Sequence, residues 1–169
     1  MILQTALRLQ EAHCDFLVMP CNTAHYFYRQ VEKELKIPFL NMIELTSSWI
    51  QNNHPPGTKV GILGTTGTLE TRLYQDCLSL YNLTSIIPTS TEQDSLVMEA
   101  IFSKKGIKSG HYKEPRKLLE KAAHALYNRG CQTIIMGCTE IPLVMEHSTE
   151  RLDPMVLLAK TAIKTAMGS

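Results

Sequence analysis

The stretch FLVMPCNTAH, residues 16–25, decides how the chain is organised. Its first four residues are apolar and predict a short buried strand that the following proline ends. Cys21 stands at the exit of this strand. Asn22 and Thr23 are residue types that cap a helix, so a helix is expected to begin directly after them. A thiol in front of a helix N-terminus lies in the partial positive charge of that helix, which can lower its pKa and make its thiolate accessible.

The same pattern occurs a second time near the end of the chain. Residues 14–21 read CDFLVMPC and residues 131–138 read CQTIIMGC, and in both segments the two cysteines are seven positions apart. A threonine follows the second cysteine of each copy, at Thr23 and Thr139. An amphipathic helix pattern precedes each copy. The two units therefore predict two similar half-structures, each presenting one thiol at the same place in the fold.

Apolar periodicity places strands and helices in alternation along the chain. Strands are expected at 16–19, 37–42, 60–63, 84–87 and within 131–138. Helices are expected at 2–13, 24–36, 44–53, 69–80, 91–103, 114–129 and from residue 153 onward, with a linker at 52–57. This alternation predicts parallel sheets with helices on both faces, and such sheets bind ligands beyond the carboxyl ends of their strands. Both thiol motifs stand at such ends.

Composition and charge exclude several other classes of protein. The chain has 169 residues, a formal net charge of +1 and 20% charged residues, which does not indicate a nucleic-acid partner. No apolar run approaches the roughly 20 residues that a membrane span needs, and the N-terminus does not have the pattern of a signal peptide. Five cysteines are an odd number without the density of a disulfide scaffold, which indicates free thiols in a reducing cytoplasm. The six histidines lack metal-binding spacing, so no metal site is expected.

Two of the five cysteines are the candidate chemical groups. Cys14, Cys77 and Cys131 are interpreted as small packing residues, which is the usual role of a free cysteine. Cys21 and Cys138 are singled out because duplication, a position at a strand end and a following threonine coincide at both. They lie far apart along the chain, so the fold must bring them together.

Two loops offer contacts to a negatively charged ligand. The loop GTTGT, residues 64–68, is neither a P-loop nor a dinucleotide motif. Its hydroxyl and N–H groups can hold a carboxylate, and simple helix capping is the alternative. Lys108 belongs to a basic stretch that is either solvated or reaches a carboxylate from a glycine-flanked loop. Glu140 is the one acidic residue placed to matter, because it lies next to Cys138.

Two thiols on separate strand ends suit two kinds of reaction. Dithiol redox chemistry usually uses a Cys-x-x-Cys motif, which is absent. In proton transfer at an acidic carbon, one thiolate removes the α-proton of an amino acid and the opposite thiol returns a proton to the other face. Because the α-proton is weakly acidic, desolvation and fixed donors around the carboxylate must supply much of the rate.

Two motifs together resemble those of a known family. PCNTAH, residues 20–25, with GCTE, residues 137–140, resembles the cofactor-independent aspartate/glutamate racemases. The aspartate branch is the more similar one, because Glu140 stands where glutamate racemases typically carry histidine. The loop at 64–68 and GIKSG at 106–110 also resemble family segments, and the resemblance covers essentially the whole chain.

The resemblance implies an α/β fold of two doubly wound, flavodoxin-like parallel-sheet domains related by pseudo-symmetry. Residues 1–52 with 153–169 would form the first domain, which contains Cys21. Residues 57–150 would form the second domain, which contains Cys138. The active site would lie between the two domains, in a homodimer that needs neither pyridoxal phosphate nor a metal.

The implied activity is racemisation of aspartate, or of glutamate, in which two thiols act as opposed acid and base. Cys21 and Cys138 would be the catalytic residues, and no nucleic acid or membrane would take part. The residues that would contact the amino-acid substrate are Asn22, Thr23, Thr65, Lys108, Thr139 and Glu140.

The chain departs from the family pattern at its start. Family members begin with a strand, a glycine-rich turn and an arginine-bearing segment that helps to bind the substrate carboxylate, and this chain begins after these features. The first domain is therefore expected to be truncated at its N-terminus. Two alternatives follow: a catalytically impaired remnant that binds carboxylates or oligomerises, and a related isomerase or lyase of the same superfamily.

Overall fold

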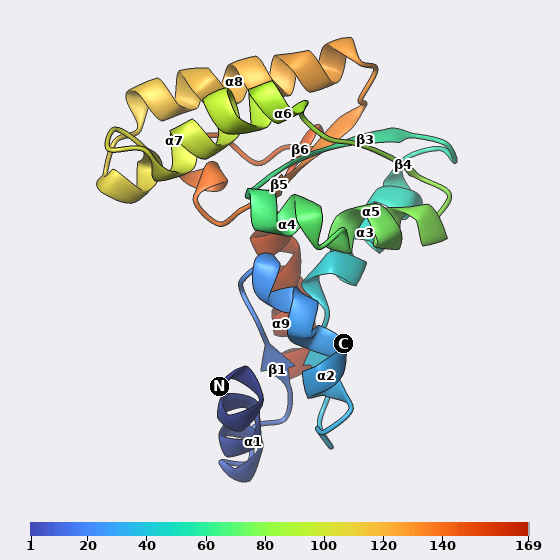
Figure 1. The fold of residues 1–169 in the computed structure, drawn as a ribbon. Coiled ribbons are helices and arrows are strands. Elements are labelled where there is room, and N and C mark those ends of the chain that lie inside the picture. Colours follow the sequence, from blue (N-terminus) through green and yellow to red (C-terminus); the bar gives the residue numbers. More distant parts are fainter. Residues whose placement is uncertain (169) are drawn as a thin grey trace.

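The computed structural model describes residues 1–168 and forms a small lobe and a large lobe (Figure 1). The small lobe, residues 1–41, contains α1 (Ile2–Glu11), β1 (Leu17–Val18), η1 (Thr23–Phe27), α2 (Tyr28–Glu32) and β2 (Phe39–Leu40). The first half of the large lobe contains α3 (Met42–Asn53), β3 (Lys59–Gly64), α4 (Thr66–Glu70), α5 (Leu73–Leu80) and β4 (Thr84–Ile86). The remaining elements are α6 (Ser90–Glu92), η2 (Gln93–Met98), α7 (Glu99–Phe102), η3 (Ile107–Ser109), α8 (Lys113–Asn128), β5 (Thr133–Gly137), η4 (Ile141–Leu143), β6 (Arg151–Leu152) and α9 (Pro154–Met167).

The sheet of the large lobe is entirely parallel and has the strand order β4-β3-β5-β6. The first strand of this sheet in the chain lies between the second and the third, which is the order of flavodoxin-like folds. β3 and β5 pair over five consecutive positions, from Val60 opposite Thr133 to Gly64 opposite Gly137. The predicted α/β class with parallel sheets is therefore confirmed.

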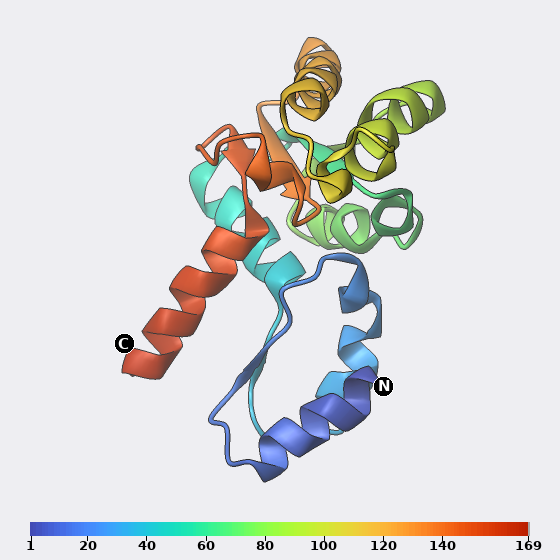
Figure 2. The same ribbon diagram turned by 90° about the vertical axis from the view of Figure 1, so that its left-hand side faces the viewer.

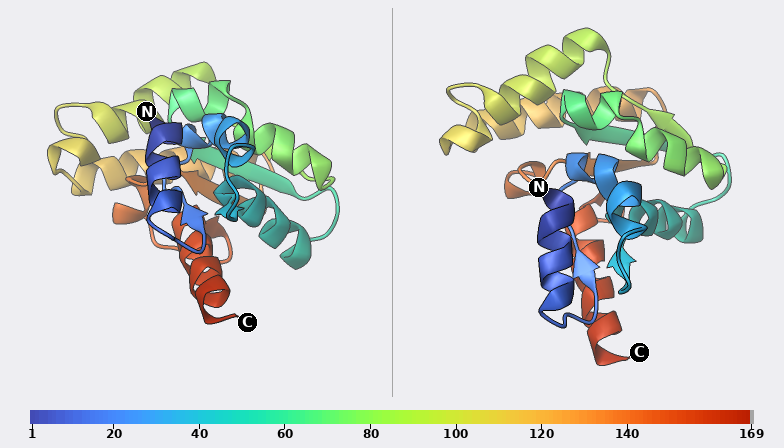
Figure 3. Two further views of the ribbon diagram at one scale, coloured as in Figure 1. Left: turned by 90° about the horizontal axis from the view of Figure 1, so that it is seen from below. Right: turned by 60° about the horizontal axis from the view of Figure 1, so that its bottom comes forward.

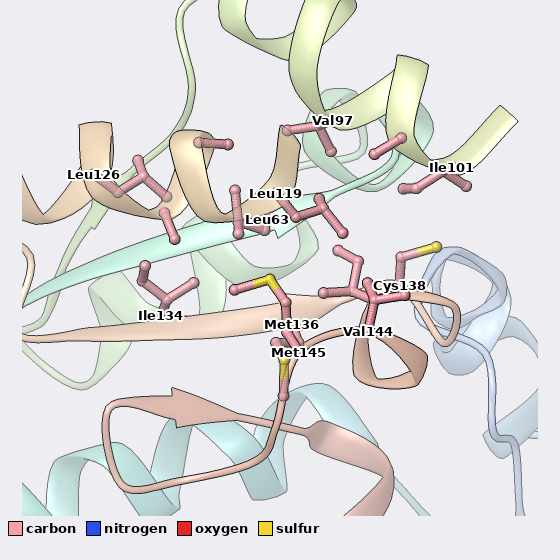
Figure 4. Packing of buried hydrophobic residues seen from close by; sticks show 14 of the residues in the cluster. Leu63, Val97, Ile101, Leu119, Leu126, Ile134, Met136, Cys138, Val144 and Met145 are labelled. Atoms are coloured by element: carbon pink, nitrogen blue, oxygen red, sulfur yellow. The ribbon is translucent and has the colours of Figure 1, made fainter. Parts of the chain in front are cut away.

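Helices cover both faces of this sheet because both faces of its central strands are apolar. On one face Val60, Ile62 and Ile135 pack against α3 and α5. On the other face Leu63 and Met136 pack against η2, α7 and α8, as Figures 1 and 4 show. A strand that is buried on both sides reads as a continuous apolar run, which is the pattern of both central strands.

The small lobe has its own minor core around a two-stranded parallel sheet. Leu17 of β1 pairs with Phe39 of β2, and Ala6 of α1 and Val31 of α2 pack in the same cluster. Figure 3 shows the ribbons of α1 and α2 beside these two strands. The buried Tyr28 hydroxyl donates a hydrogen bond of 2.6 Å to the Phe39 carbonyl. This lobe presents the first thiol motif, which follows β1.

The last helix packs along α3 and then extends beyond the sheet. Figure 2 shows α9 leaving the large lobe at an angle, with the C-terminus at its far end. Leu157 and Leu158 of α9 are buried, whereas Ile163 and Met167 are exposed. α3 contributes Ile43 to the core of the large lobe, so it belongs to that lobe by packing. The division into domains 1–52 with 153–169 and 57–150 stays a prediction.

Several elements differ from those expected from the sequence, and local hydrogen bonds explain two of them. The segment after Cys21 begins as a 3-10 helix, because the His25 ring occupies the Cys21 carbonyl and the His25 N–H bonds to Asn22 instead. The helix expected at 69–80 breaks at Arg72, whose φ is 55°, and the Gln75 side chain binds the Leu69 carbonyl there. Residues 93–98 are a π-helix, and β6 was not expected at all. None of the helices within residues 1–168 is long and apolar enough to cross a membrane.

Replacing Gly64 by alanine is expected to destabilise the fold. A Cβ there would lie 3.1 Å from the Gly137 carbonyl oxygen and 3.3 Å from the Thr68 side chain. We expect Gly64→Ala to lower the free energy of unfolding by about 1–3 kcal/mol, measured by urea denaturation. The matched control is Gly67→Ala in α4, where the nearest atom is Thr23 Cγ2 at 3.5 Å. This control should keep or raise stability, and equal stability of the two variants would contradict the argument.

Candidate active site

The candidate site lies where β3 and β5 end side by side. In a sheet of this order the connections from these two strands leave toward opposite faces, which opens a crevice at their carboxyl ends. Gly64 and Gly137 are paired at this edge and approach each other closely. Thr65 follows the first strand and Cys138 follows the second, so the two predicted site residues emerge next to each other.

Three threonine hydroxyls attach the first thiol motif to this edge. Thr23 Oγ1 lies 2.8 Å from Thr68 Oγ1 and 3.4 Å from Thr65 Oγ1. Thr65 Oγ1 and Thr68 Oγ1 are 3.1 Å apart, so the hydroxyls form a closed triangle. Because Thr23 comes from the small lobe, the triangle holds the Cys21 segment against the loop that follows β3.

Asn22 is oriented by a second contact between the lobes. Its Oδ1 accepts a hydrogen bond from the buried Tyr74 hydroxyl of α5. The residue is only 3% exposed, and its Nδ2 is buried without a hydrogen-bond partner. A buried donor left unpaired costs free energy in the absence of a ligand. The Asn22 amide therefore offers a hydrogen bond at the edge where both thiol motifs meet.

His25 joins the backbone of Cys21 to the start of α3. Its Nδ1 lies 2.8 Å from the Cys21 carbonyl oxygen, and its Nε2 accepts a hydrogen bond of 3.1 Å from the Met42 N–H. Accepting at Nε2 requires the neutral ring with the proton on Nδ1. Burial lowers the pKa of His25, and the hydrogen bond to Cys21 opposes this only in part.

The two candidate thiols have different environments. Cys21 is exposed, and the long helix expected behind it is replaced by the short segments η1 and α2. The partial positive charge of a long helix, which the sequence predicts next to this thiol, is therefore not present. Cys138 is 7% exposed, and its Sγ donates a hydrogen bond of 2.9 Å to Glu140 Oε2. Burial and this contact with Glu140 raise the pKa of Cys138 to about 12.

Glu140 is held by three donors. Besides the Cys138 thiol, the Thr139 hydroxyl donates to Oε2 at 3.0 Å, and Lys108 Nζ lies 3.4 Å from Oε1. Burial opposes ionisation of Glu140, but these donors outweigh it and lower the pKa of the carboxyl. The Lys108 ammonium also lies over the Phe102 ring, 4.6 Å from its centroid. Glu140 is thus an ionised partner of the Cys138 thiol.

The structure brings the predicted site residues into two connected groups. One group consists of Asn22, Thr23 and Thr65, next to Cys21. The other consists of Lys108, Cys138, Thr139 and Glu140. The paired ends of β3 and β5 join the groups, and in Figure 4 the Cys138 side chain points from the end of β5 toward the blue ribbon of η1. The separation of the two sulfur atoms stays a prediction.

Four residues at this edge were not among the individually predicted site residues: His25, Thr68, Tyr74 and Gln93. His25 and Thr68 lie inside the quoted motifs, so their position in the sequence was a signal that could have identified them. Tyr74 could not be identified in this way, because its partner Asn22 is 52 positions away. Gln93 of η2 donates to the Gly64 carbonyl at 2.9 Å and supports the end of β3. Within residues 1–168 no three His, Cys, Asp or Glu side chains are grouped so that they could hold a metal ion.

The chain is similar in sequence to known proteins over almost its whole length. The sequence model described as Asp/Glu/Hydantoin racemase matches residues 1–166. The broad specificity amino-acid racemase RacX of Bacillus subtilis (strain 168) is 28% identical over 167 residues, which cover 97% of this chain and 70% of the relative. The expectation of a truncated N-terminus is not supported by these matches and stays a prediction.

Solved structures share the fold. Picrophilus torridus aspartate racemase has a TM-score of 0.78 and 26% identity, over 98% of this chain and 68% of that protein. An aspartate racemase homologue from Pyrococcus horikoshii OT3 has a TM-score of 0.82 and 23% identity, over 98% of this chain and 72% of that protein. The second likeness is one of fold alone.

Replacing Glu140 by glutamine is expected to make Cys138 more reactive. The change removes the charge that disfavours the thiolate, so the pKa of Cys138 falls. We expect its alkylation by iodoacetamide at neutral to mildly alkaline pH to become about tenfold faster, followed by peptide mass spectrometry. Glu146→Gln makes the same change at an exposed residue nearby and is the control. An unchanged Cys138 rate in Glu140→Gln would refute the role of Glu140.

The His25 contact makes stability depend on pH. Because the pKa of His25 is lowered in the folded state, the unfolded chain takes up its proton first as pH falls. The stabilisation is complete above the ordinary value of 6.5 and is lost below it. Urea denaturation should show stability falling with pH in this range, and His25→Gln should reduce that slope. The control His124→Gln, at an exposed histidine of α8, should retain it.

Proposed function

Because the chain belongs to the Asp/Glu/hydantoin racemase family, we propose that it is a pyridoxal-phosphate-independent amino-acid racemase that acts on aspartate. The observation that carries this proposal is the junction of the two thiol motifs at one sheet edge. The segment after Cys21 is bound to the loop after β3, and Cys138 leaves the neighbouring strand.

The two thiols take opposite roles in the proposed reaction. The Cys21 thiolate removes the Cα proton on one face of the substrate, and the Cys138 thiol donates its proton to Cα on the other face. After one turnover Cys21 is a thiol and Cys138 is a thiolate, so the enzyme is ready for the opposite enantiomer. The environments support this assignment, because Cys138 is held as a thiol by burial and by Glu140.

The remaining residues would hold the substrate. The free Nδ2 of Asn22 and the hydroxyls of Thr23 and Thr65 offer hydrogen bonds to its amino-acid end. Fixed donors around the α-carboxylate lower the barrier, because they stabilise the charge that spreads into it when the proton leaves. Lys108 would bind the side-chain carboxylate of aspartate, which competes with Glu140 for the same ammonium group.

The choice of substrate is the finer part of the proposal. The likeness to Picrophilus torridus aspartate racemase supports aspartate. The likeness to RacX, whose name describes broad specificity, favours a wider range of amino acids as the second candidate. A panel of aspartate, glutamate and neutral and basic amino acids separates these outcomes, because Lys108 favours a second carboxylate on the substrate. A homodimer also stays a prediction.

Deuterium uptake tests the proposed chemistry. The protein in D2O should exchange the Cα proton of both L- and D-aspartate, measured by NMR. Cys21→Ser and Cys138→Ser should each lower the exchange rate by about 10²- to 10⁴-fold, because each removes an acid–base group.

Cys77→Ser is the matched control for these variants. Cys77 is a half-buried cysteine of α5, and its replacement should leave exchange near the wild-type rate. Exchange that stays near the wild-type rate after loss of either candidate thiol would refute the two-thiol mechanism. Absence of exchange by the wild-type protein with every amino acid of the panel would refute the racemase assignment.

A further inference from the structure

Tyr74 binds the first thiol motif and lies close to the second. It is fully buried in α5, in the core that also contains Ile62 and Leu78. Its hydroxyl donates a hydrogen bond of 2.5 Å to Oδ1 of Asn22, the residue directly after Cys21 in the chain. Its Cε2 atom lies 3.4 Å from the position that a Cβ of Gly137 would take, directly before Cys138. One buried side chain therefore binds the residue after Cys21 and lies close to the residue before Cys138.

The hydroxyl determines what the Asn22 amide can do. An amide side chain has one acceptor oxygen and a nitrogen with two donors. The bond from Tyr74 uses the oxygen, and Nδ2 is the atom left buried without a partner. Without this bond the amide could rotate, and its oxygen would then repel a carboxylate at the place where its N–H groups would otherwise bind one.

We propose that Tyr74 is a positioning residue for the substrate, because its hydroxyl turns the Asn22 amide toward the bound amino acid. The proposal rests on the proposed function, since it assigns the free N–H groups of Asn22 to the substrate carboxylate. The ring is a second part of the side chain and lies close to Gly137 at the end of β5. Tyr74→Phe separates the two parts, since it keeps the ring and removes the hydroxyl.

The first experiment compares two tyrosine hydroxyls. Tyr74→Phe should lower kcat/KM for aspartate exchange by about 10- to 100-fold, mostly through KM. The Asn22 amide would no longer be held toward the substrate, so its hydrogen bond to the charged carboxylate is lost. Tyr28→Phe removes another buried hydroxyl, which donates to the Phe39 carbonyl at 2.6 Å within the small lobe. It should lower the melting temperature about as much as Tyr74→Phe and leave KM near the wild-type value.

A double-mutant cycle then separates positioning from general stability. If Tyr74 acts through Asn22, Tyr74→Phe should change KM less than threefold in an Asn22→Ala background, because the amide it orients is already gone. Additive effects of Tyr74→Phe and Asn22→Ala on KM would overturn the proposal. So would a loss of kcat/KM in Tyr74→Phe no larger than that in Tyr28→Phe.

A third measurement does not depend on turnover. The side-chain amide signals of Asn22 in a nitrogen-15 NMR spectrum should shift in Tyr74→Phe and stay in place in Tyr28→Phe. Unchanged Asn22 signals in Tyr74→Phe would overturn the positioning role even for an active enzyme. A wild-type protein without racemase activity would instead refute the proposed function, and the Asn22 signals would then decide whether Tyr74 orients the amide.

Discussion

The close pairing of β3 and β5 is the constraint on which the site depends. Their last residues, Gly64 and Gly137, are paired, and a Cβ on either would lie only 3.1 or 3.2 Å from a carbonyl oxygen of the other strand. Helices cover both faces of these strands, so the strand ends are the part of the sheet that remains open to a ligand. The threonine triangle and the Tyr74 hydroxyl then fasten the small lobe to this edge. The position of the first thiol motif is thus set by contacts with the large lobe.

The two halves are similar in sequence but differ in their electrostatics. Cys21 is exposed, whereas Cys138 is buried beside a carboxylate that Lys108 and Thr139 keep ionised. In a buried environment a neighbouring negative charge strongly disfavours a thiolate. The asymmetry gives the proposed reaction a defined starting state, in which the buried thiol carries the proton. Lys108 connects this state to the substrate, because its ammonium group can serve either Glu140 or an incoming carboxylate.

Much of the fold could be predicted from the sequence, because apolar periodicity and capping residues are local signals. The central strands and the helix at 113–128 were located in this way, and so was the thiol motif at the end of β5. The sequence could not show that the His25 ring would replace a helical hydrogen bond, or that Arg72 would interrupt a helix. These outcomes depend on side-chain bonds that periodicity does not register. Tyr74 was missed for a related reason, since its contacts join segments that only the tertiary fold brings together.

The glycine pair at the ends of β3 and β5 limits how the proposed site can change. A Cβ at either position would lie 3.1 or 3.2 Å from a carbonyl oxygen of the neighbouring strand, so a larger residue requires the two central strands to shift. We therefore expect changes of substrate preference to arise more readily in the surrounding loops, such as the one that carries Lys108 between Gly106 and Gly110. Directed evolution toward other amino acids would do best with libraries confined to those loops.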